Sequence, residues 1–376
     1  MARLSGAGRY ATAEARWAGI GPYYAMFPPA FADEVVRRHS RPGDLVLDPF
    51  AGRGTSLFSA ASSGRTALGI EISPVGFVYA NAKLSPAPKD QVLESLNIVA
   101  ERSGSFDRRS DALPEFYHYC YSPPVRRFLL AARSLLNWRT SVPDRTLMAI
   151  ILVVLHGKRD YSLSNQMRQS TSMWPNYSVN WWRDRALAPP AVDPVAFLRR
   201  RIEWRYAKGR PLGSAGYAIL GDSRTELSKL SDDVIAGRQG RARLLFTSPP
   251  YYNVTNYYSD QWLRLWMLGG PDLPSARVGG RYGNKAANRR TYLYLLDAVF
   301  RNCRPLLTDD ATVYVRTDLR PVTYSVTLDV LKRMFADKII TQHDKPLEPS
   351  RQTKPYSRGG APKRANCEVD IVLKPR

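Results

Sequence analysis

The feature that most constrains the fold is a short apolar strand that ends in an acidic residue and turns at two glycines into a helix. The apolar residues 45–47 predict the strand, Asp48 ends it, and Gly52 and Gly54 precede an expected helix over 55–63. Glycines let the backbone approach a ligand closely, and a helix N-terminus offers unpaired N–H groups. The unit is therefore typical of an α/β fold with a nucleoside-cofactor site.

Other short apolar runs predict further strands of the same kind. They lie at 66–72, 218–222, 244–248, 312–315 and 368–373. Helix-length segments separate most of these strands, which indicates a mostly parallel, doubly wound, Rossmann-like sheet.

The pattern changes between residues 86 and 211. Apolar residues at helical spacing over 125–138, and an apolar run within 144–155, predict helices there. We therefore expect an inserted, mainly helical subdomain over 86–211, with a role in DNA recognition. It would divide a main domain into an N-terminal part, 1–85, and a C-terminal part, 212–376.

The chain is strongly basic, with 55 Lys+Arg against 33 Asp+Glu in 376 residues and a net charge of +22. Most of the excess lies beyond residue 90, and such a charge predicts a nucleic-acid partner. No apolar run approaches the roughly 18 residues of a membrane span, so no membrane partner is expected. Four dispersed histidines and three scattered cysteines argue against a metal site and against a disulfide framework, and they fit a reducing cytoplasm.

The turn after the first strand indicates which cofactor fits. Glu71 ends the next strand, nineteen residues after Gly52, where an acid can accept hydrogen bonds from ribose hydroxyls. No Gly-Lys-Ser/Thr follows the turn, a third glycine is missing, and Asp48 would repel a pyrophosphate. A cationic, phosphate-free cofactor with the character of S-adenosylmethionine fits better.

Five segments resemble the S-adenosylmethionine-dependent DNA amino-methyltransferases. The VLDPFAGRGT and GIEIS segments resemble motifs I and II, and residues 219–223, 246–251 and 22–29 resemble motifs III, IV and X. The resemblance implies a cofactor site in which Glu71 holds the ribose and Asp222 lies near the adenine. The cofactor-binding residues that it indicates are Asp48, Phe50, Gly52, Gly54, Thr55, Glu71 and Asp222.

Motif IV supplies the expected catalytic residues, Ser248, Pro249, Pro250 and Tyr251. An acceptor at Ser248 and the carbonyl of Pro249 would take the two hydrogens of an exocyclic amine and aim its lone pair at the sulfonium methyl. Prolines lack N–H groups and fix φ, which makes the turn rigid. Tyr251 would stack on a base swung out of the duplex.

A second Ser-Pro-Pro segment, at 122–124, lacks the aromatic residue and precedes a helical pattern. We interpret it as a helix start. None of the three cysteines lies in a Pro-Cys turn after a strand, so methylation of carbon 5 of cytosine, which needs a cysteine nucleophile, does not fit.

A serine at the first position of motif IV resembles the enzymes that make N4-methylcytosine. N6-adenine and RNA amine targets stay open, because motif I precedes motif IV here, a circular permutation of many Ser-Pro-Pro-Tyr members. We expect a site-specific DNA methyltransferase acting on double-stranded DNA in the cytoplasm, at the nucleoid, with a cognate restriction endonuclease as a possible partner.

Basic and aromatic segments give candidate DNA contacts. They are the loop 277–290, residues 161–166 with their amides, Trp181 and Trp182, residues 253–258 after the catalytic turn, and the basic tail 338–364. Core packing remains the alternative for the two tryptophans.

Overall fold

The computed structural model describes residues 10–21, 27–211, 215–253, 257–275, 288–343 and 368–376. Motif X, the loop 277–290 and the tail 338–364 lie largely outside these residues. The chain divides into two compact units. One comprises Tyr24–Ala80, Leu212–Asn256 and Gly283–Arg376, and the other comprises Met1–Tyr23, Asn81–Pro211 and Tyr257–Tyr282.

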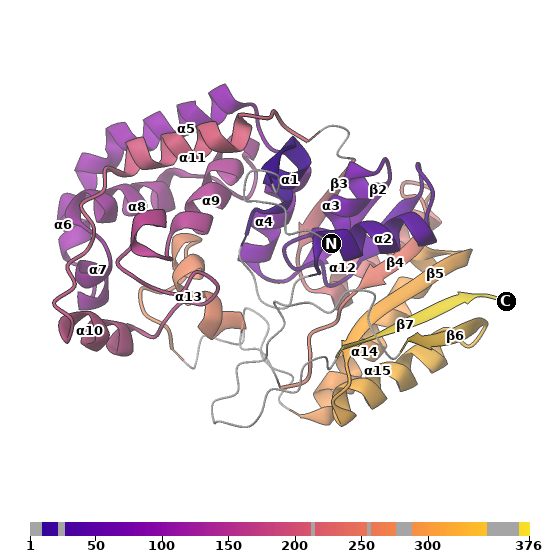
Figure 1. The fold of residues 1–376 in the computed structure, drawn as a ribbon. Helices are drawn as coiled ribbons and strands as arrows, with labels where there is room; N and C mark the ends of the chain where they lie inside the picture. Colours follow the sequence, from indigo (N-terminus) through magenta and orange to yellow (C-terminus); the bar gives the residue numbers. More distant parts are fainter. Residues whose placement is uncertain (1–9, 22–26, 212–214, 254–256, 276–287, 344–367) are drawn as a thin grey trace. The chain divides into compact units, whose positions relative to one another are not determined.

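The first of these, the sheet unit, holds seven strands in the order β3-β2-β1-β4-β5-β7-β6 (Figure 1). Neighbouring strands from β3 to β5 are parallel, and β7 runs antiparallel to both β5 and β6. The strands are β1 (Leu45–Asp48), β2 (Thr66–Glu71), β3 (Gly216–Leu220), β4 (Ala242–Thr247), β5 (Leu307–Asp318), β6 (Lys338–His343) and β7 (Glu368–Pro375). The predicted doubly wound, mostly parallel sheet is confirmed.

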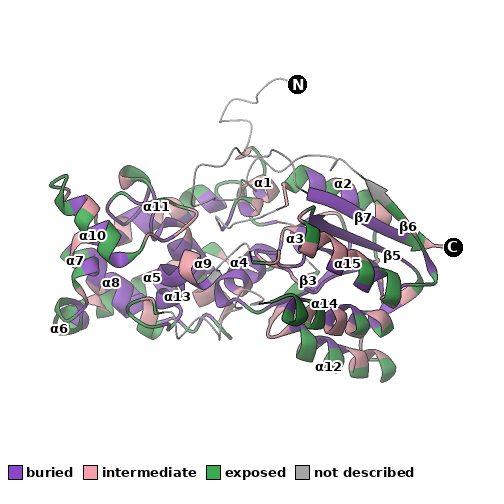
Figure 2. Ribbon diagram, turned by 90° about the horizontal axis from the view of Figure 1, so that it is seen from below, coloured by how far each residue is buried: buried purple, intermediate pink, exposed green. Residues whose placement is uncertain are grey.

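Helices cover both faces of this sheet. Figure 2 shows α2 on one side of β5 and β7, and α12, α14 and α15 on the other. The helices of this unit are α2 (Pro29–His39), α3 (Thr55–Ser62), α4 (Pro74–Leu84, which begins here), α12 (Ser223–Ile235), α14 (Arg289–Cys303) and α15 (Pro321–Met334), with a 3₁₀ turn, η5 (Arg304–Leu306).

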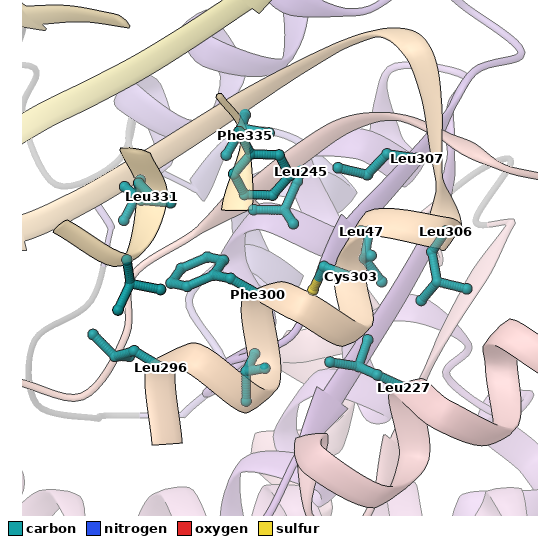
Figure 3. Close-up of a cluster of buried hydrophobic side chains, with 14 of the residues drawn as sticks. Leu47, Leu227, Leu245, Leu296, Phe300, Cys303, Leu306, Leu307, Leu331 and Phe335 are labelled. Carbon is teal, nitrogen blue, oxygen red and sulfur yellow. The ribbon is translucent and has the colours of Figure 1, made fainter. Parts of the chain in front are cut away.

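Side chains that alternate along each strand pack against different helices on the two faces of the sheet. On one face, apolar side chains such as Leu47, Leu245 and Val313 join the buried faces of α12, α14 and α15 in one hydrophobic cluster (Figure 3). On the other face, Phe31 of α2 packs edge-on against Phe246, with ring centroids 5.8 Å apart. This alternation follows from the twofold side-chain period of a strand.

The second unit, the helical unit, consists of helices and loops in the part that the structure describes. Its elements are α1 (Ala13–Ala18), α5 (Lys89–Arg102), η2 (Ser103–Phe106), α6 (Asp107–Asp111), α7 (Glu115–Cys120), α8 (Pro123–Leu135), α9 (Val142–Val154), η3 (Arg159–Tyr161), α10 (Pro175–Arg183), α11 (Pro194–Tyr206) and α13 (Tyr257–Met267). The 86–211 segment lies in this unit, together with α1 and α13. That it is an inserted, DNA-reading subdomain stays a prediction.

Several sequence interpretations concern this unit. The helix start at the second Ser-Pro-Pro segment is confirmed, because α8 begins at Pro123 with Ser122 before it. The expected base-edge contacts of residues 161–166 are wrong for Asn165, which is buried and donates its amide hydrogens to the carbonyls of Tyr119 and Leu187. Trp182 is buried as well and donates to the Gln166 carbonyl.

None of the described helices is long and apolar enough to cross a membrane. The described residues also contain no group of three or more His, Cys, Asp or Glu side chains that could hold a metal ion.

Candidate active site

The two turns singled out in the sequence lie where the strand order of the sheet reverses. From β1 the chain proceeds to β2 and β3 on one side, and β4 and β5 lie on the other. Val46 and Leu47 pair with Leu244 and Leu245, so the carboxyl ends of β1 and β4 are adjacent. In open α/β sheets, ligands bind beyond the strand ends at this switch point.

The turn after β1 has the backbone shape that its glycines permit. Gly52 and Gly54 adopt φ of 54° and 72°, in the left-handed region that favours glycine. A Cβ on Gly54 would stand 2.7 Å from the Cβ of Ala80, whereas a Cβ on Gly52 would meet nothing within 4 Å. The backbone at Gly54 is therefore packed against α4, and the backbone at Gly52 borders open space.

Glu71 closes this turn from the end of β2. Its Oε2 accepts a hydrogen bond from the Gly52 N–H at 2.6 Å, and its Oε1 accepts one from the Ser73 N–H at 2.8 Å. Burial raises the pKa of Glu71 to about 7, while these hydrogen bonds oppose the rise and the charge of Asp48 adds to it. Each carboxylate oxygen can accept a further hydrogen bond, so the site retains the capacity to hold ribose hydroxyls.

Asp48 links the glycine turn to the turn that begins at Ser248. Its Oδ1 accepts hydrogen bonds from the Phe50 N–H at 3.0 Å and from Thr247 Oγ1 at 2.6 Å, and its Oδ2 accepts one from Ser56 Oγ. Burial raises its pKa to about 6, against the effect of these three bonds. Because Thr247 directly precedes Ser248, this buried carboxyl joins the ends of β1 and β4. No sequence pattern indicates this second role, and contact of Asp48 with the cofactor stays a prediction.

Two further cofactor candidates lie on the same turn. Thr55 begins α3, and its Oγ1 is buried without a hydrogen-bond partner among the described residues. Phe50 is half-buried and packs against the apolar cluster. A buried hydroxyl without a partner among the described residues fits a bound ligand that supplies one.

Asp222, expected near the adenine, follows β3. Its side chain caps α12 through the Arg224 N–H at 2.9 Å, and the Arg224 guanidinium lowers its pKa through hydrogen bonds and charge. The neighbouring Ser223, which sequence reasoning missed, donates to the carbonyl of Pro49 at 2.5 Å. The end of β3 is thereby tied to the turn after β1.

The turn Ser248–Tyr251, which is expected to be catalytic, directly follows β4. Pro249 is buried, whereas Ser248, Pro250 and Tyr251 are half-buried. Tyr251 Oη donates a hydrogen bond to Glu368 Oε1 at 3.0 Å. Of the residues expected after the turn, Asn253 is exposed, and residues 254–256 lie outside the described part.

Beneath this turn is a buried charged group that sequence reasoning missed. Arg316 of β5 lies opposite Asp370 of β7 and donates to both of its carboxylate oxygens, at 2.6 and 2.8 Å. The guanidinium also lies 3.4 Å from the ring centroid of Phe31. A signal was present in the sequence, because Glu368 and Asp370 share one face of a strand whose other face, Val369, Ile371 and Leu373, is apolar.

Residues 7–81, which contain the glycine turn and Glu71, match the N6/N4 methyltransferase family model, described as a DNA methylase. This match supports an amino-methyltransferase family for the chain. The cofactor of this methyltransferase is therefore S-adenosylmethionine, which the residues around Gly52 and Thr55 fit.

Curated relatives agree with this assignment. The methyltransferase is 22% identical to the type II methyltransferase M.MjaII of Methanocaldococcus jannaschii, in a match that covers 88% of this chain and 78% of that protein. It is 34% identical over 83 residues to the DNA adenine methyltransferase YhdJ of Escherichia coli, covering 22% of this chain and 28% of that one.

A search of solved structures matches the rRNA methyltransferase aviRa of Streptomyces viridochromogenes. Its sequence is 13% identical, the TM-score is 0.35, and the match covers 99% of this chain and 94% of that chain. TrmN of Thermus thermophilus is 11% identical with a TM-score of 0.34 over 96% of this chain and 52% of that chain.

Proposed function

We propose that this methyltransferase modifies DNA at the exocyclic N4 amine of cytosine, in a base swung out of the duplex. The observation that carries the proposal is the bond from Thr247 to Asp48. It anchors the Ser248 turn beside the glycine turn, at the switch point of the sheet. The Ser248 turn and the glycine turn are thus fixed to the same carboxylate. This arrangement suits in-line methyl transfer, because most of the rate enhancement comes from positioning the amine against the methyl group.

Each residue of the proposed catalytic turn has its own role. Ser248 and the carbonyl of Pro249 accept the two amine hydrogens, which directs the nitrogen lone pair away from the ring. When bound, S-adenosylmethionine supplies the electrophilic methyl group. Pro249 and Pro250 keep the turn rigid because their φ angles are fixed. Tyr251 presents its ring to the extruded base.

The glycine turn and Glu71 would hold the cofactor in this proposal, with Thr55, Phe50 and Asp222 as further contacts. Ionised Glu71 accepts from the ribose hydroxyls, and Thr55 Oγ1 gains a hydrogen-bond partner. The helical unit would contribute DNA contacts through its basic residues.

The alternative is the N6 amine of adenine. The relative named as a DNA adenine methyltransferase supports it, since that protein is 34% identical over its matched segment. The same acceptor geometry serves either amine, so both targets use the same residues in the same roles.

The test is to express the chain in a host that lacks DNA methylation, digest the DNA to nucleosides and identify methylated bases by mass spectrometry. N4-methylcytosine is the expected product, with none from a Ser248→Ala variant of equal expression. N6-methyladenine would replace the proposed target with its alternative. Unmodified DNA in cells containing cofactor-binding protein would refute a DNA substrate for the chain alone.

A further inference from the structure

Helix α11 of the helical unit carries a dense group of positive charges. Residues 194–210, which form this helix and the turn after it, hold six basic side chains and a single acid, Glu203. The basic residues are Arg199, Arg200, Arg201, Arg205, Lys208 and Arg210. Within the same unit, α11 packs against α1 and lies beside α5 (Figure 1). We call these six residues, together with Trp204 and with Arg16 of α1, the α11 surface.

Helical spacing divides the surface into an exposed row and a more buried row. Arg200 and Trp204 lie one turn apart and are exposed, and Lys208, just after the helix, is exposed as well. In the neighbouring row Arg201 is half-buried and Arg205 is 8% exposed. Like charges one turn apart on a helix repel each other. The fold therefore holds cations close together where neither water nor distance fully relieves their repulsion.

Two guanidinium groups lie against the ring of Trp204. The Cζ atoms of Arg16 and Arg205 are 4.8 and 5.1 Å from its centroid, within the range of a cation–π contact. Arg16 also donates to the carbonyl of Trp204, and Arg205 donates to the carbonyl of Arg16. These contacts restrict the arginines before any ligand arrives, which lowers the entropy cost of binding one.

Within the described part of the chain, the arginines of this surface donate hydrogen bonds to uncharged oxygens and not to carboxylates. The acceptors are the carbonyls of Tyr10, Trp204, Tyr161, Arg16 and Pro86 and the side-chain oxygen of Asn97. Exposed arginines of the sheet unit behave differently, since Arg238 pairs with Asp233 and Arg301 with Asp297. The α11 surface therefore keeps its positive charge available for an anion from outside.

The ionisation of the buried row agrees with this view. Burial lowers the pKa of Arg205 to about 10, and the charges of Arg16 and Arg201 act in the same direction. Burial and the charge of Arg200 likewise lower the pKa of Arg201. A nearby anion favours the charged form of such groups and would offset their repulsion.

We propose that the α11 surface binds the sugar–phosphate backbone of duplex DNA and contributes affinity without reading the base sequence. Guanidinium groups match phosphate oxygens in a bidentate geometry. Phosphate contacts hold a protein on the duplex but carry no sequence information directly. The inference rests on the proposed function, because it names a surface with which the methyltransferase holds its DNA.

Binding measurements on charge variants test the surface. Arg200→Gln combined with Lys208→Gln removes two exposed cations of the α11 surface. Arg238→Gln combined with Arg301→Gln is the matched control, because it removes the same charge from exposed positions in the sheet unit. Fluorescence anisotropy measures the binding of each full-length variant to a labelled duplex of mixed sequence over a series of salt concentrations.

The surface variant should bind about tenfold more weakly at low salt, and its slope of log affinity against log salt should fall by about 0.9 for each lost phosphate contact. The loss should be the same on a duplex of different sequence. The control should stay within about twofold of wild type. Without DNA the surface variant should melt no lower than wild type, because the removal of Arg200 relieves repulsion on Arg201. An unchanged salt slope in the surface variant, or an equal loss in the control, would overturn the proposal.

Binding is measured without methyl transfer, so the surface and the proposed function can fail separately. In methylation assays the surface variant should show a raised KM for DNA and an unchanged kcat. Wild-type protein that shows the binding effect but leaves DNA unmethylated refutes the proposed function alone. Protein that methylates DNA while the surface variant keeps its salt slope refutes the α11 surface alone. If the variant loses affinity for an RNA duplex of the same sequence and not for DNA, DNA is the wrong partner.

Discussion

Two segments of the chain share the residues Ser-Pro-Pro and use them differently. At Ser122 the prolines begin helix α8, and the serine hydroxyl is buried without a hydrogen-bond partner among the described residues. At Ser248 the prolines follow β4, and the fourth residue, Tyr251, reaches Glu368. The Ser-Pro-Pro sequence alone therefore does not define a catalytic site, and the secondary structure before and after it determines its role.

The residue before each serine is anchored by its hydroxyl, but to a different group. Thr247 donates to the Asp48 carboxyl beside the glycine turn, whereas Tyr121 donates to the carbonyl of Leu155 at 3.0 Å, within the helical unit. One anchor connects a Ser-Pro-Pro segment to a cofactor turn, and the other connects it to helix α9. Matched substitutions in the two segments can test this difference.

The largest difference is expected between the two serines themselves. Ser248→Ala removes the acceptor for the target amine and should lower the methylation rate about a hundredfold or more, with cofactor binding retained. Ser122→Ala removes a hydroxyl without a described partner and should leave the rate within about twofold of wild type. Single-turnover assays on both variants make the comparison, and equal rates in the two would contradict it.

The anchors should differ by a smaller amount. Thr247→Val keeps the side-chain shape and removes the bond to Asp48, so we expect about 1 kcal/mol less stability and about tenfold slower methylation. Tyr121→Phe removes the other anchor and should cost similar stability with normal methylation. Denaturant melts and rate assays measure the two effects, and an unimpaired rate in Thr247→Val would show that the link to Asp48 does not position the turn.

The smallest expected effect concerns the ionisation of Glu71, which contacts the glycine turn. Burial raises the pKa of Glu71 to about 7. The ionised form, which prevails above that pH, is the one that accepts from ribose hydroxyls, so S-adenosylmethionine should bind a few-fold more tightly at pH 8 than at pH 6.

Calorimetry at the two pH values checks this expectation. Glu71→Gln should bind more weakly and lose the difference, whereas Ser122→Ala should keep it. Tighter binding at pH 6 in wild type would contradict the assigned role of Glu71.

The sequence predicted those parts of the molecule that depend on neighbours in the chain. The strand ending at Asp48, the left-handed glycines and the start of α8 at Pro123 all follow from local patterns. It did not predict the bonds of Asp48 to Thr247 or of Tyr251 to Glu368, which join residues 199 and 117 positions apart. Such pairs depend on which strands lie side by side and in which register.

Two sequence interpretations failed for related reasons. Residues 338–343 were assigned to a basic tail, yet they form β6, because pairing with β7 outweighs their polar composition. Asn165 was expected to offer its amide to a base, yet the fold uses it to satisfy two main-chain carbonyls. A polar residue type does not reveal whether its partner is a ligand or the protein itself.

The pair of Arg316 and Asp370 also restricts how the last strand can join the sheet during folding. A shift of β7 by one residue would turn Asp370 toward the apolar cluster and leave the arginine without its carboxylate. An unpaired buried charge is far more costly than a lost apolar contact. Misaligned forms of the C-terminal strand would thus be rejected as the protein folds, and the same alignment delivers Glu368 to the catalytic turn.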